Sequence, residues 1–294
     1  MIRARLGIAT RRFGPSGRWP AGQRGAEETL RDLLQTAADA RLDLVDASAL
    51  DGEVERMLGR SWPFPSPFQV ATKTTRLADG LDRLEARARR SLERLGLARA
   101  QTLLVAEPED LMGSDGRALW ARLQRLKDEG LYRQIGFCAD VEDEPVALAR
   151  RYQPDVVQTR CSLLDQRAAQ QGVIAELAGL NVEVHLRSPL SGALLFQDRQ
   201  VLPPELAHVG PRLSRIRRGL AEAGADPLAA SLSYALTLPG VSAVLVGATS
   251  PAELRAVIAA SFAPSPRLDF RAFALDEGGA QARAWTPRTV TSAA

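Results

Sequence analysis

Aromatic residues, cysteine and histidine are all scarce in this chain of 294 residues. Aromatic side chains make up only 5% of it. The chain therefore lacks the alternation of aromatic and basic residues that stacks and holds nucleic acid, and we expect no nucleic-acid partner. The two cysteines, Cys138 and Cys161, have neither metal-binding nor redox spacing, and the two histidines, His185 and His208, are too few for a histidine-rich site. We therefore expect no metal site.

Long apolar runs are also missing. No stretch approaches the roughly 18 apolar residues that a membrane-spanning helix needs. The first ten residues, MIRARLGIAT, lack the apolar centre of a signal peptide. We therefore expect no membrane partner. Cysteine this sparse is typical of a reducing compartment, and we expect a cytoplasmic protein.

Short apolar runs alternate with amphipathic helical patterns along the chain, whose hydrophobic content of 45% is enough for a large core. The patterns predict strands at residues 5–9, 42–45, 68–72, 102–105, 135–137, 156–158, 182–186 and 241–246. They predict helices at 26–40, from about 53, and at 81–95, 117–129, 145–151, 167–178, 211–223, 227–238 and 251–260. Residues 187–192 have the composition of a loop.

Eight strand–helix units, repeating about every thirty residues, favour a closed (β/α)8 TIM barrel, a fold that needs roughly 250 residues. We expect one barrel domain over residues 1–294, with about 286–294 as a disordered tail. An open, doubly wound sheet is the alternative. It is disfavoured because no G-x-G-x-x-G motif follows the first strand.

Asp46 and Lys73 are the first candidate site residues, because each follows a predicted buried strand directly. Ionisable groups at the ends of parallel strands are open to ligands while the strand holds them in place. Lysine occurs only at Lys73 and Lys127, although lysine and arginine together number 38. Because nearly every other cation of the chain is arginine, we interpret the lysine at this position as having a chemical role. The alternative is a structural pair between Lys73 and Asp46.

Several other residues have both a functional and a structural interpretation. The arginines of the predicted helix 81–95 could form an anion-binding patch, although a solvated helix face is favoured. Cys138 could be a nucleophilic thiol, but a small buried hydrophobic residue is favoured. His185 could face the mouth of the barrel or be a satisfied interior histidine.

A set of short segments recurs along the chain in a recognisable order. They are Leu6-Gly7, Asp46 with Gly52, Glu55, Leu58 and Gly59, Ala71-Thr72-Lys73, Ser91 to Gly96, Leu126 to Gly130, Ile135-Gly136, Pro154 to Gln158, Arg187-Ser188-Pro189-Leu190 and Val246-Gly247-Ala248. Each segment is weak alone, but in their order and spacing the chain resembles the aldo-keto reductases over nearly its whole length. The resemblance implies a (β/α)8 barrel that binds NAD(P)H across its C-terminal mouth and transfers hydride to a carbonyl group.

The resemblance also implies a catalytic tetrad, of which only two members match. A family tyrosine gives a proton to the carbonyl oxygen, a lysine and an aspartate tune it, and a histidine orients the substrate. Asp46 and Lys73 match the aspartate and the lysine. The tyrosine position is Asp51 and the histidine position is Ala106.

Asp51 is a poor replacement for a phenol. The reaction needs a general acid that remains protonated at neutral pH beside the developing alkoxide. A free aspartic acid has a pKa of about 3.9, and a nearby ammonium group favours its charged form. We therefore expect Asp51 to be an anion and the chain not to be a standard carbonyl reductase. Asp51 could instead work with Asp46 as a second carboxylate, or simply form a turn before Gly52.

The cofactor residues that the resemblance implies are a mixed set. Gln158 matches the residue that holds the nicotinamide amide, but its usual Ser-Asn partners are Cys138-Ala139. Ser188, Leu190 and Gly192 match the family loop that carries the cofactor pyrophosphate. Arg187 and Gly247 are the other cofactor contacts that the resemblance implies. Glu253 stands where users of NADPH often have arginine, and its charge disfavours a 2′-phosphate. We expect NADH rather than NADPH, or no nicotinamide cofactor at all.

Three functions remain open. The first is other small-molecule chemistry, such as elimination or isomerisation, by Asp46, Asp51 and Lys73. The second is NAD(P)H-dependent reduction of a small aldehyde, ketone or sugar, with the proton supplied by water or another residue. The third is a catalytically silent sensor or partner subunit. In each case we expect a small-molecule ligand and a monomer or weak oligomer, since no heptad pattern is present.

Overall fold

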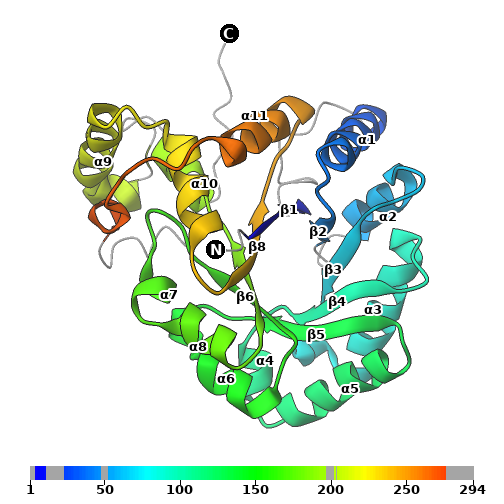
Figure 1. The fold of residues 1–294 in the computed structure, drawn as a ribbon. Coiled ribbons are helices and arrows are strands. Elements are labelled where there is room, and N and C mark those ends of the chain that lie inside the picture. The colour runs from blue at the N-terminus through cyan, green and yellow to red at the C-terminus, as the bar shows by residue number, and fades with distance from the viewer. Residues whose placement is uncertain (1–3, 11–22, 48–51, 197–201, 203, 276–294) are drawn as a thin grey trace.

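The computed structural model describes residues 4–10, 23–47, 52–196, 202 and 204–275. Within these residues, eight parallel strands pair in chain order, and the first strand closes on the last to form a barrel. Helices ring the strands on the outside (Figure 1). The strands are β1 (Arg5–Ala9), β2 (Leu44–Asp46), β3 (Gln69–Lys73), β4 (Ala100–Val105), β5 (Tyr132–Cys138), β6 (Val156–Arg160), β7 (Glu183–Arg187) and β8 (Val241–Val246). The predicted (β/α)8 barrel is thus confirmed.

The helices follow the predicted amphipathic segments. They are α1 (Gln23–Asp39), α2 (Gly52–Ser61), α3 (Leu81–Leu95), α4 (Glu109–Met112), α5 (Gly116–Asp128), α6 (Pro145–Tyr152), α7 (Arg167–Gln170), α8 (Val173–Gly179), α9 (Gly210–Glu222), α10 (Pro227–Thr237) and α11 (Pro251–Phe262). Short 3₁₀ helices are η2 (Leu77–Asp79), η3 (Val141–Asp143), η4 (Ser191–Phe196), η6 (Pro204–Val209) and η7 (Phe270–Phe273). None of the helices in the described ranges is both long and apolar enough to cross a bilayer.

Two predicted segments differ from the structure. The single helix expected at 167–178 is divided into α7 and α8, because Gly172 between them has a left-handed backbone with φ of 78°. The loop expected at 187–192 is shorter than predicted. Arg187 completes β7, and η4 begins at Ser191.

The apolar core is divided between the inside and the outside of the barrel. Alternate strand residues such as Val45, Leu103 and Phe137 belong to the two large clusters that also contain the buried helix residues. Two small clusters are separate from these, Leu44 with Ala243 and Leu245, and Leu104 with Cys138 and Val156. Because successive strand residues face opposite sides, these small clusters line the barrel interior.

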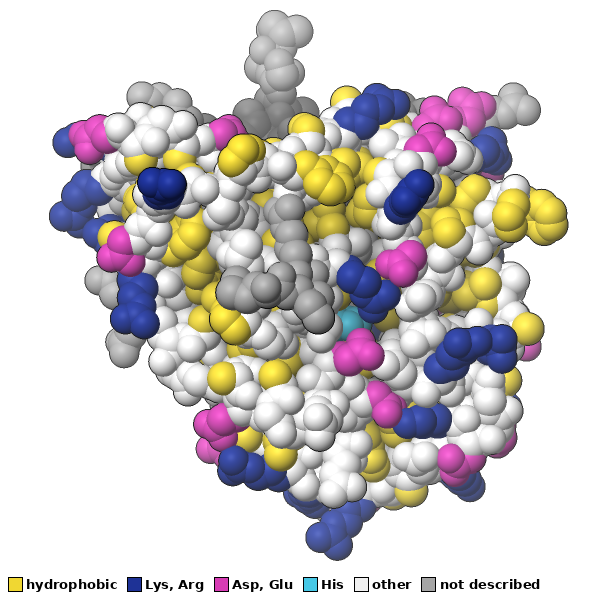
Figure 2. All heavy atoms as spheres, in the orientation of Figure 1, with side chains coloured by type: hydrophobic (Ala, Val, Ile, Leu, Met, Phe, Trp, Pro, Cys, Tyr) yellow, Lys and Arg dark blue, Asp and Glu magenta, His cyan; other side chains and the backbone are white. Residues whose placement is uncertain are grey.

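The C-terminal ends of the parallel strands form one mouth of the barrel. Asp46, Lys73, Cys138, Arg160 and Arg187 are the last residues of β2, β3, β5, β6 and β7. The barrel therefore gathers the chemically active side chains of five strands at one end. On the face seen in Figure 2, by contrast, acidic and basic side chains are interspersed with hydrophobic ones.

Candidate functional site

Asp46 and Lys73 form a close ion pair at the ends of two neighbouring strands. In the parallel register of β2 and β3, Asp46 lies opposite Ala71, and Lys73 follows two residues later on the same side of the strand. Lys73 Nζ donates to Asp46 Oδ1 at 2.5 Å and to Oδ2 at 2.6 Å. The two side chains are only 16% and 11% exposed. A charge-assisted pair so shielded from water holds both side chains in fixed positions.

Gln158 connects this ion pair to the wall of the barrel. Its Nε2 donates to Asp46 Oδ1 at 3.1 Å, and its Oε1 accepts a hydrogen bond from Cys138 Sγ at 3.6 Å. Gln158 is completely buried. The resemblance implies that Gln158 is a nicotinamide contact. In this structure each end of its amide is bonded to the protein through one of its two hydrogen-bonding positions.

Cys138 is the neutral member of this network. Burial raises the pKa of the Cys138 thiol more strongly than the nearby charges of Lys73 and Arg187 lower it. The thiol is therefore protonated at neutral pH and acts as a hydrogen-bond donor to Gln158. This environment favours the interpretation of Cys138 as a packed interior residue rather than a nucleophile.

A second charged cluster lies at the same mouth and was not predicted as a unit. Arg187 Nη2 is 2.8 Å from Asp140 Oδ1, and Arg160 Nε is 3.2 Å from Asp140 Oδ2. The backbone N–H of Arg160 also donates to Asp140 Oδ1 at 2.9 Å. Two arginines thus share one carboxylate of a residue that is only 3% exposed. Arg187, a predicted cofactor contact, is directed to Asp140.

Asp140 lies two residues after the end of β5, whereas Asp46 is the last residue of β2. Its position near the end of a buried strand was the feature of the sequence that could have identified it as a site residue. The involvement of Arg160 and Arg187 could be recognised only once β5, β6 and β7 were known to be neighbours.

The segment from Ser188 to Ala193 carries the residues predicted to hold a pyrophosphate. Its backbone is left-handed at Ser188, Ser191, Gly192 and Ala193, with φ between 49° and 66°. Ser188 and Gly192 are exposed, Leu190 is half-buried, and Ser191 Oγ lies 2.6 Å from Ser162 Oγ. Two of its backbone N–H groups donate within the segment, Ser191 N to the Ser188 carbonyl and Ala193 N to the Leu190 carbonyl, both at 2.9 Å. Pyrophosphate binding at this segment stays a prediction.

The end of β8 supplies the remaining predicted contacts. Gly247 directly follows the strand and is half-buried. Glu253 Oε2 accepts hydrogen bonds from Thr249 N at 2.8 Å and Thr249 Oγ1 at 2.9 Å. Ser250 Oγ accepts one from Glu253 N at 3.1 Å. The Glu253 carboxylate thus takes part in capping the N-terminus of α11, and these hydrogen bonds hold its negative charge in place there.

All three tyrosines of the chain have hydroxyl partners away from Lys73. Tyr132 donates to the Ala88 carbonyl at 2.8 Å and Tyr152 to the Leu111 carbonyl at 2.6 Å. The hydroxyl of Tyr234 lies 3.7 Å from Cys161 Sγ.

Neither histidine contacts the ion pair. His185 is buried within the barrel, where Nε2 lies 3.4 Å from Glu183 Oε2, and His208 is exposed on η6. At the predicted histidine position, Ala106 N donates to Thr74 Oγ1 at 3.3 Å. The next residue, Glu107, pairs with Arg76 at 3.5 Å. Asp51, the residue predicted at the tyrosine position, lies outside the described residues. No group of three potential metal ligands occurs in the ranges that the structure covers.

The chain is similar in sequence or in fold to several known proteins. An aldo-keto reductase of Mycolicibacterium smegmatis is 30% identical over 183 residues, which cover 60% of this chain and 62% of that protein. The match thus spans less than two thirds of the relative's length. An aldo-keto reductase of Bacillus halodurans, solved in its holo form, superposes with a TM-score of 0.71 at 20% identity, covering 94% of this chain and 91% of that one. A glycerol dehydrogenase of Gluconobacter oxydans superposes with a TM-score of 0.69 at 17% identity, covering 99% and 95%.

The sequence model of the Aldo/keto reductase family matches residues 12–272, which is most of the chain. At identities below 25%, the two solved structures establish the shared barrel alone. Together with the ordered segments of the sequence, the family match shows that this chain belongs to the aldo/keto reductase family.

Proposed function

We propose that the protein binds a small molecule at the C-terminal mouth of its barrel and uses Asp46 and Lys73 there for chemistry other than phenol-assisted carbonyl reduction. The observation that carries this proposal is the position of the tyrosines. The hydroxyls of Tyr132, Tyr152 and Tyr234 are all bonded elsewhere, so the chain has no phenol to place beside Lys73.

The ion pair suits reactions in which negative charge develops on a substrate oxygen. The ammonium group of Lys73 is a compact point charge, and its two short contacts with Asp46 hold it at the mouth of the barrel. A fixed cation in a site with little water stabilises an enolate or alkoxide strongly. An elimination or isomerisation needs such stabilisation together with a base, but it needs no hydride. We favour this reaction class.

Reduction with a nicotinamide cofactor is the second candidate. Its support is the family resemblance of the turn from Ser188 to Ala193, where Ser188 and Gly192 are exposed, and the position of Gln158 beside the ion pair. When bound, the cofactor would supply a hydride. Asp46 and Lys73 would orient the carbonyl oxygen, and a water molecule would have to supply the proton. The fixed carboxylate of Glu253 favours NADH over NADPH, because it would repel a 2′-phosphate.

One set of assays distinguishes these two candidate functions. Purified protein is incubated with NADH or NADPH and a panel of aldehydes, ketones and sugars, and cofactor oxidation is followed at 340 nm. In parallel, a small-molecule library is screened by thermal shift with wild type and Lys73→Met. Lys127→Met is the matched control, because it removes the other lysine, which pairs with Asp155 at 2.6 Å and 2.8 Å.

The proposal predicts ligands that stabilise wild type and Lys127→Met but not Lys73→Met, without oxidation of either cofactor above the background rate. Oxidation of NADH or NADPH at several turnovers per second would overturn it in favour of the reductase. Ligands that stabilise Lys73→Met as strongly as wild type would place the binding site elsewhere.

A further inference from the structure

The arginines of α3 fall into two groups. Arg89 forms ion pairs with Glu85 at 2.9 Å and with Glu129 at 2.6 Å, so its positive charge is balanced by carboxylates of the protein. Arg83 and Arg90, by contrast, are exposed and have no ion-pair or hydrogen-bond partner within the described parts of the chain. The exposure of Arg83 and Arg90 agrees with the predicted solvated helix face.

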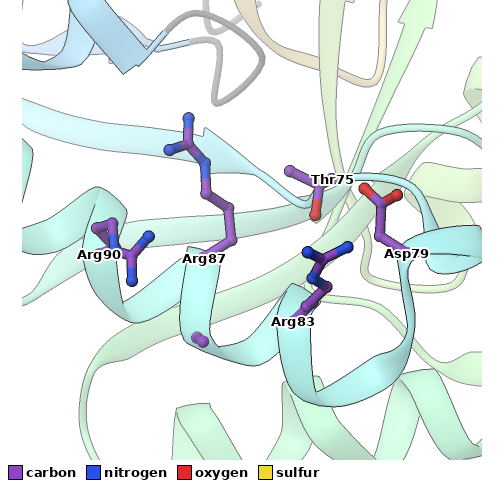
Figure 3. Close-up of a pocket in the computed structure, with 6 residues that line it drawn as sticks. Thr75, Asp79, Arg83, Arg87 and Arg90 are labelled. Atoms are coloured by element: carbon purple, nitrogen blue, oxygen red, sulfur yellow. The ribbon is translucent and has the colours of Figure 1, made fainter.

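The second group lines a cavity. Together with Arg87, the two unpaired arginines face a hollow of about 330 Å³ between α3 and the end of β3. Its lining residues are Thr75, Asp79, Arg83, Ala86, Arg87 and Arg90. Figure 3 shows the guanidinium group of Arg83 directed toward Thr75 and Asp79, with Arg87 and Arg90 further along the same helix. A hollow of this size suits a small ligand.

The positions of the three lining arginines lower the stability of helix α3 when no ligand is bound. Arg83, Arg87 and Arg90 follow the spacing i, i+4, i+7, so three like charges lie along one face and repel one another. Arg83 also lies in the first turn, where the helix dipole disfavours a cation. An anion in the hollow would remove both penalties.

Cationic side chains outnumber acidic ones in the lining of the hollow. Asp79 is its acidic residue, against Arg83, Arg87 and Arg90. Glu55, completely buried on α2, is 3.6 Å from Arg87. Arg83 and Arg90 have no ion-pair partner among the described residues.

The hollow reaches the rim of the candidate site. Thr75 is two residues beyond Lys73, and two residues of extended chain span at most about 7 Å. We infer that this arginine-lined hollow holds the phosphoryl group of the small molecule whose other end meets Asp46 and Lys73. The part about the shared ligand rests on the proposed function above, whereas binding of the phosphoryl group does not.

The chemistry of the lining favours a phosphoryl group over a single carboxylate. A phosphoryl group carries close to two negative charges at neutral pH, more than a single carboxylate, and its three oxygens can accept hydrogen bonds from guanidinium groups. Thr75 is half-buried and adds a hydroxyl donor. The substrate class expected for this member of the family is therefore a phosphorylated small molecule.

The first experiment tests the hollow alone. Binding of inorganic phosphate is measured by calorimetry at low ionic strength with wild type and with the double variant Arg83→Gln/Arg90→Gln. The control is Arg117→Gln/Arg133→Gln, which removes the same charge from two exposed arginines on α5 and β5. We expect the first variant to weaken phosphate binding about tenfold or more and the control less than twofold. Equal affinity in all three proteins would overturn the assignment and leave the Asp46–Lys73 proposal unaffected.

The second experiment tests the shared ligand. Phosphorylated small molecules and their dephosphorylated counterparts are compared by thermal shift. We expect stabilisation by phosphorylated compounds that is lost both in Arg83→Gln/Arg90→Gln and in Lys73→Met, and retained in Lys127→Met. Stabilisation that is lost in the arginine variant but fully kept in Lys73→Met would show that the ligand does not reach the ion pair, and would overturn this part of the inference.

Discussion

The amide of Gln158 donates to Asp46 Oδ1 at 3.1 Å, joining residues that are 112 positions apart in the chain. This bond links a predicted cofactor contact with a predicted catalytic residue. The other end of the amide accepts from Cys138 Sγ at 3.6 Å. The buried side chain of Gln158 thus bridges the Asp46–Lys73 pair and Cys138.

Replacing Glu55 by glutamine should lower the stability of the barrel. Glu55 is completely buried on α2 and faces Arg87 and Arg94 of α3, so its removal leaves two largely buried cations without their carboxylate. We expect the free energy of unfolding to fall by about 3 kcal/mol, measured by urea denaturation. The exposed Glu93→Gln is the control and should change it by less than about 0.5 kcal/mol. A loss for Glu55→Gln no larger than the control's would mean that the buried cluster contributes nothing net.

Glu183 should make stability depend on pH in the acid range. Its pKa is lowered from the ordinary value of 4.5, mainly by its hydrogen bond with His185 and further by Gln134, against the opposing effect of burial. A lowered pKa means that the contribution is fully present above the unfolded value and is lost as pH falls through the lower folded value.

The urea midpoints of wild type and Glu183→Gln should therefore differ most near neutral pH and converge below pH 4.5. Because the Glu183 side chain is 41% exposed, solvent screening keeps the difference small. A difference that stays constant from pH 7 to pH 3 would contradict the assignment.

Two glycines should respond in opposite ways to replacement by alanine. A Cβ atom on Gly136 of β5 would collide with the backbone carbonyl oxygen of Val156 on β6, which cannot move without shifting the strand. We expect Gly136→Ala to destabilise the barrel by about 3 kcal/mol or more. Gly179, at the end of α8, has nothing within 4 Å of such an atom.

Gly179→Ala should therefore be neutral or stabilising by up to about 1 kcal/mol, since alanine restricts the unfolded chain. Thermal denaturation of both variants checks the pair. Similar losses at the two positions would show that backbone entropy, and not the close approach of β5 and β6, determines the result.

The fold was largely predictable because local patterns and tertiary packing agree. The strand predicted at 241–246 and the helix predicted at 81–95 have the same bounds in the structure, where Gly96 ends the helix with φ of 65°. The break at Gly172 was missed because the apolar periodicity continues across it, and only the backbone conformation shows the interruption.

The candidate site was predictable only in part, for a physical reason. Asp46 and Lys73 each follow a buried strand, which is a local signal. The Asp140 cluster and the hydrogen bonds of Gln158 depend on which strands become neighbours when the barrel closes. The arginines of α3 were visible in the sequence, but the separation of paired from unpaired ones requires the positions of Glu85 and Glu129.

The most direct test of the central claim is the rate of NADH-dependent carbonyl reduction by wild type and by Asp51→Tyr, measured with the same aldehydes. By the family resemblance, a tyrosine at position 51 would supply the missing general acid, a contribution of about 10²–10⁴-fold. The account predicts a wild-type rate at background. A measurable rate in Asp51→Tyr would show that the rest of the site still accepts NADH. A wild type that already reduces aldehydes at several turnovers per second, with no gain from the tyrosine, would contradict it.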